Sequence, residues 1–128
     1  MSVVASVYRV TGGRSGRSAL LLTTVGAKSG EDRTASLRRF DEGSRQWLVV
    51  GSAGGSVTHP AWVYNLAANP DKVWAEVGRG RFKVRPELLA GDERGRAWAR
   101  ILAEAPQFAA YETTTDRAIP VFRLTVDA

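Results

Sequence analysis

Short apolar runs, separated by glycine, proline and polar clusters, dominate the hydrophobic pattern of this chain. Residues 19–24 (ALLLTT) are mostly apolar and stop before Gly26, and residues 46–52 (QWLVVGS) are apolar almost throughout. Runs this short predict strands rather than helices, and the second run is typical of a strand buried on both faces. A further strand is expected at residues 34–40, before a turn at 41–44. The economical arrangement of these three strands is an antiparallel meander.

A helical period follows the third strand. Trp62 and Leu66 are four residues apart and predict the buried face of a helix over residues 61–69. Thr58 is the expected cap of this helix, and Pro60 is expected in its first turn.

Residues 72–77 and 81–84 alternate between apolar and polar positions on either side of the turn at 78–80, which predicts a hairpin. Pro86 has no backbone N–H to donate, so the second strand of this hairpin is expected to run out at a sheet edge near that residue.

Four further elements are predicted in the last third of the chain. They are a helix capped by Asp92 that runs to about residue 105, a short helical turn with Phe108 and Tyr111, a polar loop at 113–120 and a strand at 121–126. The whole pattern therefore predicts an α+β fold, in which about six strands form a small antiparallel sheet that curls into a barrel beside two or three helices. Residues 1–128 are interpreted as one domain, with residues 1–18 as an N-terminal segment that includes a flexible approach to the first strand.

The composition narrows the chemistry. The chain has no cysteine, which excludes disulfides, a thiol nucleophile and thiolate metal sites, and its lone histidine, His59, cannot hold a metal by itself. Neither a signal peptide nor a membrane span is indicated at the N-terminus, so a cytoplasmic location is expected. The formal charge of +5 favours an anionic partner, which could be a nucleic acid, a phosphorylated cofactor or an acidic lipid surface.

The turn between the first two strands carries the clearest binding signal. Gly26 and Gly30 bracket a tip that contains Lys28 and Ser29, and Arg33 follows shortly after. Such a tip can direct several backbone N–H groups toward one point, with charged and hydroxyl donors around it. The tip therefore predicts an anion-binding corner, and the alternative is an ordinary hairpin with solvated charges.

A second candidate anion site lies at the start of the predicted helix, which follows a Gly-Gly loop and presents unpaired backbone N–H groups. Familiar catalytic motifs are missing: there is no phosphate-binding P-loop, no dinucleotide-binding glycine motif and no nucleophile elbow. Binding features without an obvious nucleophile suit a protein whose cofactor performs the reaction.

Three blocks of sequence, LLLTTVGAKSGEDR, SAGGSVTHPAWVYNLAANP and TTTDRAIPVF, resemble in this order the deazaflavin-dependent nitroreductase family of actinobacteria. The resemblance covers residues 19–126 and implies a split β-barrel that binds coenzyme F420. FMN remains an alternative on residue type alone, because both cofactors offer a phosphate and a tricyclic face.

The resemblance also implies which residues form the site. The cofactor-binding positions are Ala27, Lys28 and Ser29 at the phosphate and oligoglutamate tail, Arg33, Thr34, Ala35, Ser36, Leu37 and Arg38 beside the cofactor, Val50, Gly51, Ser52, Ala53, Gly54 and Gly55 beneath the phosphate and ring, and Ala61, Trp62, Val63, Tyr64 and Asn65 on the helix. Phe108 and Tyr111 would stand near the substrate face of the ring, and Tyr111 is the candidate catalytic residue. An orienting role for Tyr111 is favoured over proton donation, since an ordinary tyrosine is a slow proton source. No metal site is expected.

The function expected from this resemblance is hydride transfer from reduced F420 to a small electron acceptor, such as a quinone, a nitroaromatic compound or an activated enone. A homodimer is the expected assembly, with neither an integral membrane segment nor a nucleic-acid partner.

Two rival hypotheses follow from other features. Ala27, Ala53 and Ser36 replace the arginine, the lysine or asparagine and the proline that the family usually has, which leaves open a non-catalytic F420- or flavin-binding carrier or sensor. A nucleic-acid binder is suggested by the arginines around Trp74 and Phe82. It is disfavoured because no recognition motif is present and the alternation directs Phe82 toward the core.

Overall fold

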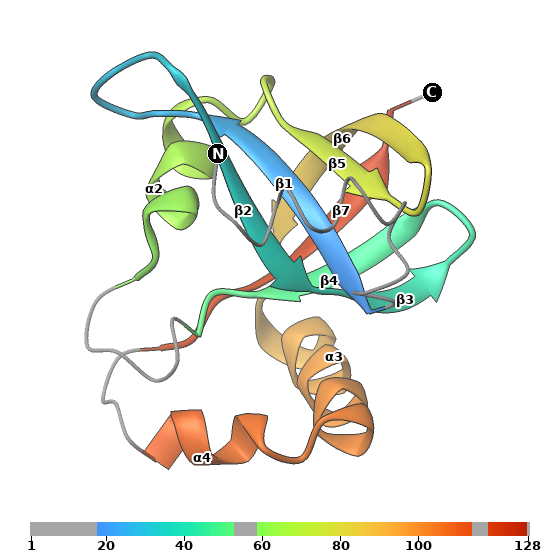
Figure 1. The fold of residues 1–128 in the computed structure, drawn as a ribbon. Helices are drawn as coiled ribbons and strands as arrows, with labels where there is room; N and C mark the ends of the chain where they lie inside the picture. Colours follow the sequence, from blue (N-terminus) through green and yellow to red (C-terminus); the bar gives the residue numbers. More distant parts are fainter. Residues whose placement is uncertain (1–17, 53–58, 114–117, 128) are drawn as a thin grey trace.

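The computed structural model describes residues 18–52, 59–113 and 118–127. Within these ranges the chain forms seven strands and three helices (Figure 1). In chain order they are β1 (Ala19–Val25), β2 (Asp32–Arg38), β3 (Phe40–Gly43), β4 (Gln46–Val50), α2 (Ala61–Ala68), β5 (Trp74–Val77), β6 (Gly80–Leu88), α3 (Gly91–Glu104), α4 (Phe108–Thr113) and β7 (Val121–Val126). None of these helices has the length and apolar character needed to span a membrane.

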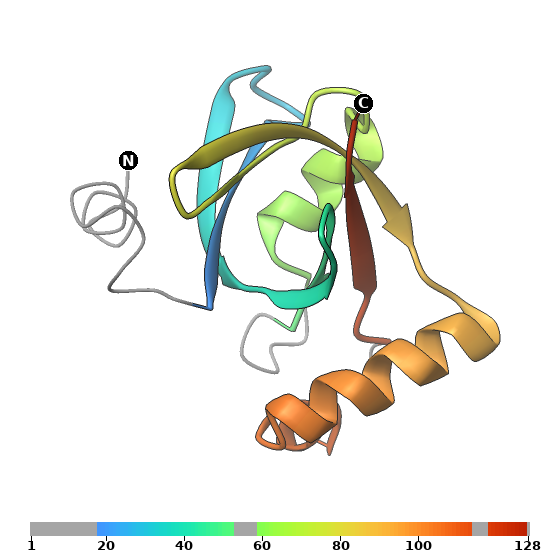
Figure 2. The ribbon, with the colours of Figure 1, turned by 90° about the vertical axis from the view of Figure 1, so that its right-hand side faces the viewer.

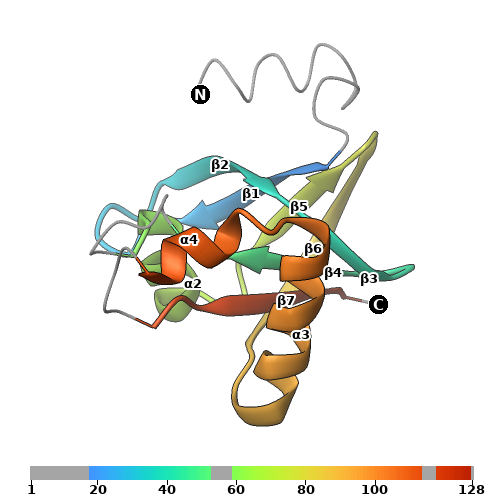
Figure 3. The same ribbon diagram turned by 90° about the horizontal axis from the view of Figure 1, so that it is seen from below.

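One antiparallel sheet, in the order β2-β1-β5-β6-β7-β4-β3, contains all seven strands. Its edge strands, β2 and β3, are consecutive in the chain with only Arg39 between them. The sheet must therefore curl until its two edges meet, and Figure 2 looks along the resulting barrel, with α2 at its far end. Helices α3 and α4 lie outside the barrel, on the side that Figure 3 presents to the viewer. The predicted α+β barrel is confirmed.

Strand β4 is buried on both faces, as its apolar run predicts. Trp47 and Val49 belong to the hydrophobic cluster inside the barrel, whereas Leu48 and Val50 belong to a second cluster with α3 and α4. Strand β7 connects the same two clusters, because Val121 belongs to the second cluster and Phe122, Leu124 and Val126 belong to the first. These two strands therefore attach the helical layer to the barrel.

The predicted three-stranded meander is wrong. The run at residues 34–40 belongs to two strands, and β2 pairs with β1 while β3 pairs with β4. Arg39 forms the corner: its backbone N–H donates to the carbonyl of Ser18 at 2.6 Å, and its guanidinium donates to the carbonyl of Ala19 at 2.6 Å and to Asp41 at 3.1 Å. A single straight strand could not pair with β1 at one edge of the sheet and with β4 at the other, so the chain turns at Arg39.

Pro86 does not end its strand, contrary to the prediction. Strand β6 continues to Leu88, and Pro86 pairs with Leu124 of β7. The proline is tolerated because β6 pairs with β5 only from Gly80 to Lys83, so beyond that stretch its register is with β7 alone.

Two helix starts also differ from the prediction. Pro60 occupies the N-cap position of α2 rather than its first turn, and Thr58 lies outside the described residues. Ala90 occupies the N-cap of α3, and Asp92 sits within the first turn, where its carboxylate still faces the positive end of the helix dipole. The expected buried face of α2 is confirmed, because Trp62 is only 6% exposed.

Arg123 of β7 lies at the centre of an ion cluster that joins β3, β6 and α3. Its Nε is 2.5 Å from Oε1 of Glu42, and its Nη1 is 2.8 Å from Glu93 and 3.3 Å from Glu87. The side chains of Arg123 and Glu42 are 16% and 17% exposed, so either charge would be costly without the other. Hydrogen bonds from Glu42 and Glu93 raise the pKa of Arg123 further above its ordinary value, so the cation persists wherever the protein is folded.

Replacing Arg123 with methionine is expected to lower the free energy of unfolding by about 2 kcal/mol, because the three carboxylates lose their shared cation while remaining close together. Urea denaturation measures this change. Arg85→Met is the matched control, since the pair between Arg85 and Asp127 is solvent-exposed and its loss should cost less than about 0.5 kcal/mol. Equal effects of the two substitutions would contradict the structural role of the cluster.

Candidate functional site

A cleft of about 910 Å³ opens between the β1–β2 turn and helix α2. Its walls come from the turn, from the first half of β2 and from one side of the helix, on the left of Figure 1. The lining residues are Thr24, Gly26, Ala27, Lys28, Ser29, Arg33, Thr34, Ala35, Ala61, Trp62, Tyr64 and Asn65. The structure thus brings together the two regions that the sequence marks as anion sites, the basic tip and the start of the helix.

The tip is closed by its own backbone. The N–H of Gly26 donates to the carbonyl of Glu31 at 2.7 Å, and the N–H of Gly30 donates back to Gly26 at 2.9 Å. Gly30 has a φ of 72°, which a residue with a side chain rarely adopts. The Ser29 hydroxyl accepts the N–H of Glu31 at 3.1 Å. Several of the N–H groups expected to converge on a ligand are therefore already occupied within the turn.

Asn65 fastens the tip to α2. Its side-chain oxygen accepts the backbone N–H of Ala27 at 3.0 Å, and its amide nitrogen donates to the hydroxyl of Thr24 at 3.1 Å. Asn65 is 6% exposed and Thr24 is 1% exposed, so both hydrogen bonds are shielded from water. One buried amide therefore fixes the distance between the two walls of the cleft.

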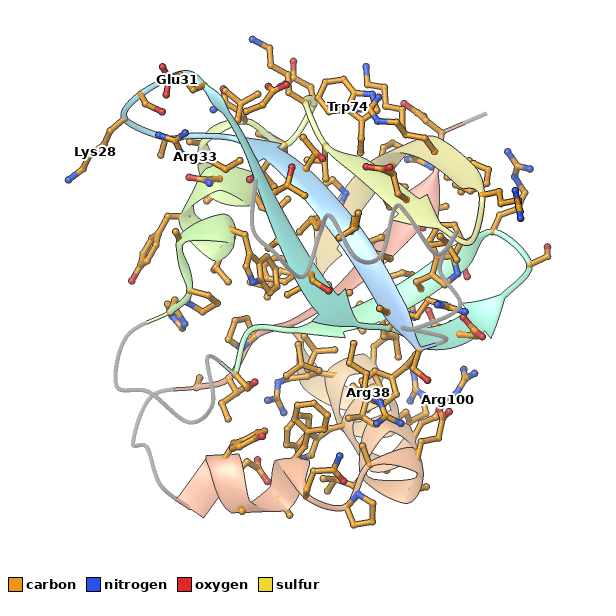
Figure 4. All side chains as sticks on the ribbon, in the orientation of Figure 1. Lys28, Glu31, Arg33, Arg38, Trp74 and Arg100 are labelled. Carbon is orange, nitrogen blue, oxygen red and sulfur yellow. The ribbon has the colours of Figure 1, made fainter. Side chains whose placement is uncertain are left out.

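The charges at the cleft mouth are Lys28, Arg33 and Glu31, and Figure 4 shows all three side chains at the tip. Arg33 pairs with Glu31 at 3.2 Å, and both side chains are mostly exposed. Lys28 has no carboxylate partner among the described residues, and in Figure 4 it extends away from the turn. A polyanion at this position would meet one unpaired ammonium and a guanidinium that must be shared with Glu31.

A smaller hollow of about 260 Å³ continues along β2 toward α4. It is lined by Ser36, Leu37, Arg38, Val50, Ser52, Pro60, Trp62 and Phe108. Trp62 belongs to both linings, so the two spaces meet at this residue. In the described part of the chain, two aromatic residues and one arginine thus border the second space.

The ring of Phe108 is held from both sides. It lies edge-on to Phe40 with the ring centres 5.8 Å apart and edge-on to Tyr111 at 5.2 Å. Phe40 is 1% exposed and therefore a fixed support. The position of α4 relative to the barrel accordingly determines the width of the smaller hollow.

Most of the cofactor-binding residues named from the sequence line one of these two spaces. Gly51, Val63 and Tyr111 line neither. A Cβ added at Gly51 would come within 2.7 Å of Pro120 and 3.0 Å of Val63, so this glycine allows two segments to pack closely. Tyr111 packs against Phe108, which does line the smaller hollow.

Ala53, Gly54 and Gly55 lie outside the described residues. The structure adds Thr24, Gly26 and Pro60 to the lining. The sequence marks Gly26 only as part of a flexible turn. Thr24 could not be predicted either, because its contact with Asn65 joins residues that are 41 apart in the chain.

The chemistry of the lining suits a ligand with a polyanionic tail and a flat apolar ring. Lys28, Arg33 and the Ser29 hydroxyl supply donors for phosphate or carboxylate oxygens, while Ala35, Trp62 and Leu37 supply apolar contacts. A curled antiparallel barrel with such a cleft defines the class of the molecule: a split β-barrel protein with a cofactor-sized cleft at one end.

Comparisons with known proteins narrow this class to a family. The family model described as F420H(2)-dependent quinone reductase matches residues 2–126. The F420H(2)-dependent quinone reductase Rv1261c of Mycobacterium tuberculosis H37Rv is 39% identical over an aligned length of 130 residues, gaps included, and the alignment covers 94% of this chain and 85% of that protein.

Two solved structures have the same fold. An F420-H2 dependent reductase, FDR-A, has a TM-score of 0.75 and 38% identity, covering 84% of this chain and 94% of the other. A domain-swapped dimer has a TM-score of 0.77 and 35% identity, covering 95% of this chain and 96% of the other. The chain belongs to the F420H(2)-dependent quinone reductase family. This confirms the resemblance noted in the sequence and its cofactor, coenzyme F420, rather than FMN.

Replacing Asn65 with alanine is expected to release the tip from α2. The N–H of Ala27 and the Thr24 hydroxyl would both lose their partner, and an unsatisfied buried polar group costs about 1–3 kcal/mol. Amide hydrogen exchange at Ala27 should accelerate at least tenfold, or ~1.4 kcal/mol in local stability. Asn69→Ala is the control, since Asn69 donates one side-chain bond of 3.3 Å to Val25 and none to the tip. Unchanged exchange at Ala27 in Asn65→Ala would contradict this assignment.

Proposed function

We propose that this protein transfers a hydride from reduced coenzyme F420 to a quinone. The larger cleft would hold the phosphate and glutamate tail of the cofactor, and its ring would lie toward Trp62, facing the smaller hollow. The observation that carries this proposal is the meeting of the two spaces at Trp62, because it joins a cationic groove to an aromatic hollow within one site.

In the net reaction the quinone gains a hydride and a proton to become a hydroquinone, and the F420H2 that supplies them is oxidised to F420. The residues of this chain position the reactants. Lys28 and Arg33 bind the anionic tail, and Trp62 and Phe108 provide flat walls for planar rings. These walls also keep water away from the place where the hydride moves.

Tyr111 acts in this proposal by orienting Phe108. Its ring lies 5.2 Å from that of Phe108, and it is outside the lining of both spaces. This geometry supports the orienting role over proton donation.

His59 lies edge-on to Tyr64 with ring centres 5.8 Å apart, which supports a packing role for the single histidine.

A relative of known structure is a domain-swapped dimer, which supports the homodimer expected from the sequence as the assembly of this chain.

The rival function is a carrier or sensor that binds F420 without reducing an acceptor. The basic tip between β1 and β2 does not distinguish the carrier from the reductase, because both would have to bind the anionic tail of F420. The aromatic hollow favours the reductase, since a carrier has no need of a second space beside the ring. Nitroaromatic compounds and enones are further candidate acceptors, and the flat walls suit a quinone equally well.

Lys28→Ala and Arg33→Ala are each expected to raise the dissociation constant for F420 about tenfold, because each removes a charge-assisted hydrogen bond to the tail. The melting temperature should stay nearly unchanged, since exposed charges contribute little to stability. Equilibrium titration of cofactor fluorescence measures the binding. Lys83→Ala, an exposed lysine of β6 outside both linings, serves as the control. Equal affinity in all four proteins would remove Lys28 and Arg33 from the site.

Anaerobic mixing of the protein with F420H2 and menadione is expected to regenerate oxidised F420 in stoichiometric amounts. The return of deazaflavin absorbance over time measures the rate. Tight F420H2 binding without any reduction of menadione, a nitroaromatic compound or an enone would establish the carrier or sensor instead.

A further inference from the structure

Arg38 is the last residue of β2 and, among the described residues, the only guanidinium in the lining of the smaller hollow. Figure 4 shows its side chain between the end of β2 and the helical layer, far from the tip that carries Lys28 and Arg33. Its position separates it from the residues that would bind the anionic tail of the cofactor. It faces the space where the acceptor would lie.

The guanidinium of Arg38 is held in place by an aromatic support. Its central carbon lies 5.2 Å from the centre of the Phe40 ring, and Phe40 is 1% exposed. The same ring supports Phe108, which lines the hollow. Stacking on a ring uses the face of a guanidinium and leaves the N–H groups at its edge available for hydrogen bonds.

The charge of Arg38 is not neutralised by the described part of the chain. Nearby arginines have carboxylate partners: Arg39 pairs with Asp41, and Arg33 pairs with Glu31. Arg38 has no carboxylate within ion-pair distance among the described residues, and its guanidinium contacts the Phe40 ring. Arg38 is exposed to solvent at the end of β2, so its guanidinium is accessible to a ligand that enters the hollow with its own negative charge.

The shape of the guanidinium narrows the choice of ligand. Its planar edge donates two parallel hydrogen bonds, which match two oxygens side by side in one plane. The anion of a hydroxyquinone presents such a pair, because its ionised oxygen lies next to a carbonyl oxygen of the same ring. A neutral quinone without this substituent offers one carbonyl at a time.

We infer that Arg38 is a specificity-determining residue that selects planar acceptors with an ionised oxygen beside the reducible carbonyl, the hydroxynaphthoquinone class. This inference rests on the proposed quinone reductase function. Hydride transfer also places negative charge on a quinone oxygen, so the same guanidinium stabilises the charge that develops there.

Lawsone and menadione test this inference, because they are naphthoquinones of similar size. Lawsone carries a hydroxyl that is ionised at neutral pH, and menadione carries a methyl group. Binding of each to protein saturated with oxidised F420 is measured by quenching of tryptophan fluorescence, with a correction for absorbed light. The ratio of the two dissociation constants reports the selectivity, and any effect of a substitution on cofactor affinity cancels in it.

Arg38→Gln is expected to shift this ratio about tenfold against lawsone, as loss of a charge-assisted pair predicts. Arg38→Lys keeps the positive charge but lacks the planar pair of N–H donors, so it should lose a smaller part of the selectivity. Arg81→Gln is the matched control, because Arg81 also stacks on an aromatic ring, Trp74, at 5.3 Å, and lines neither space. Added salt should reduce the preference of the unmodified protein and leave that of Arg38→Gln unchanged.

An unchanged ratio in Arg38→Gln, or a loss of F420 affinity with no change in the ratio, would overturn the inference. Failure of the unmodified protein to bind either quinone would overturn it as well. The proposed function fails separately, when both quinones bind but neither is reduced by F420H2.

Discussion

The site depends on the buried amide of Asn65. Its two hydrogen bonds join α2 to β1 and to the tip across 41 and 38 residues of sequence. Asn69, at the end of α2, adds a bond of 3.3 Å to the carbonyl of Val25 in β1 and none to the tip. Because the rest of α2 is fixed by Trp62 and Leu66 in the barrel interior, the amide transmits the rigidity of the core to an otherwise exposed turn. A cleft between a helix and a hairpin can thus keep its width without a disulfide or a metal.

The arginines divide into structural and ligand-facing groups according to their partners. Arg123 has three glutamates and Arg39 has Asp41 and a carbonyl, so these cations hold strands together. Arg38 and Lys28 line the site and have no carboxylate among the described residues. The excess of basic residues is therefore not a diffuse property of the surface. Part of it is concentrated where a polyanionic cofactor and an acceptor with an ionised oxygen would lie, and such placement raises local ligand concentration as well as affinity.

Local pattern predicted most of the fold, since β1, β4, α2, α3 and β7 each follow from periodicity and length. The errors in the strands share one cause, which is closure of the sheet. Arg39 divides one apparent strand into two, and Pro86 lies inside a strand whose partner changes from β5 to β7. Neither event leaves a local signal, because the pairing that decides it involves residues far away in the chain. The same limit applies to the site: the basic tip is visible in the sequence, whereas its attachment to Asn65 is not.

The two spaces differ in how firmly their walls are held, and this difference bears on function. The cofactor cleft is bounded by the sheet and by a clamped helix, so its dimensions are set by the barrel. The wall of the smaller hollow at Phe108 comes from a six-residue helix, α4. An edge-to-face contact between Phe108 and Phe40 joins this helix to the barrel, and Phe108 and Tyr111 also pack against the cluster that includes α3. Edge-to-face ring contacts are each worth about 0.5–1.5 kcal/mol, less than the packing of a whole strand, so α4 can shift at modest cost. A rigid cleft for a constant cofactor beside an adjustable wall for the acceptor allows one barrel to serve different acceptors through changes in α4 and at the end of β2.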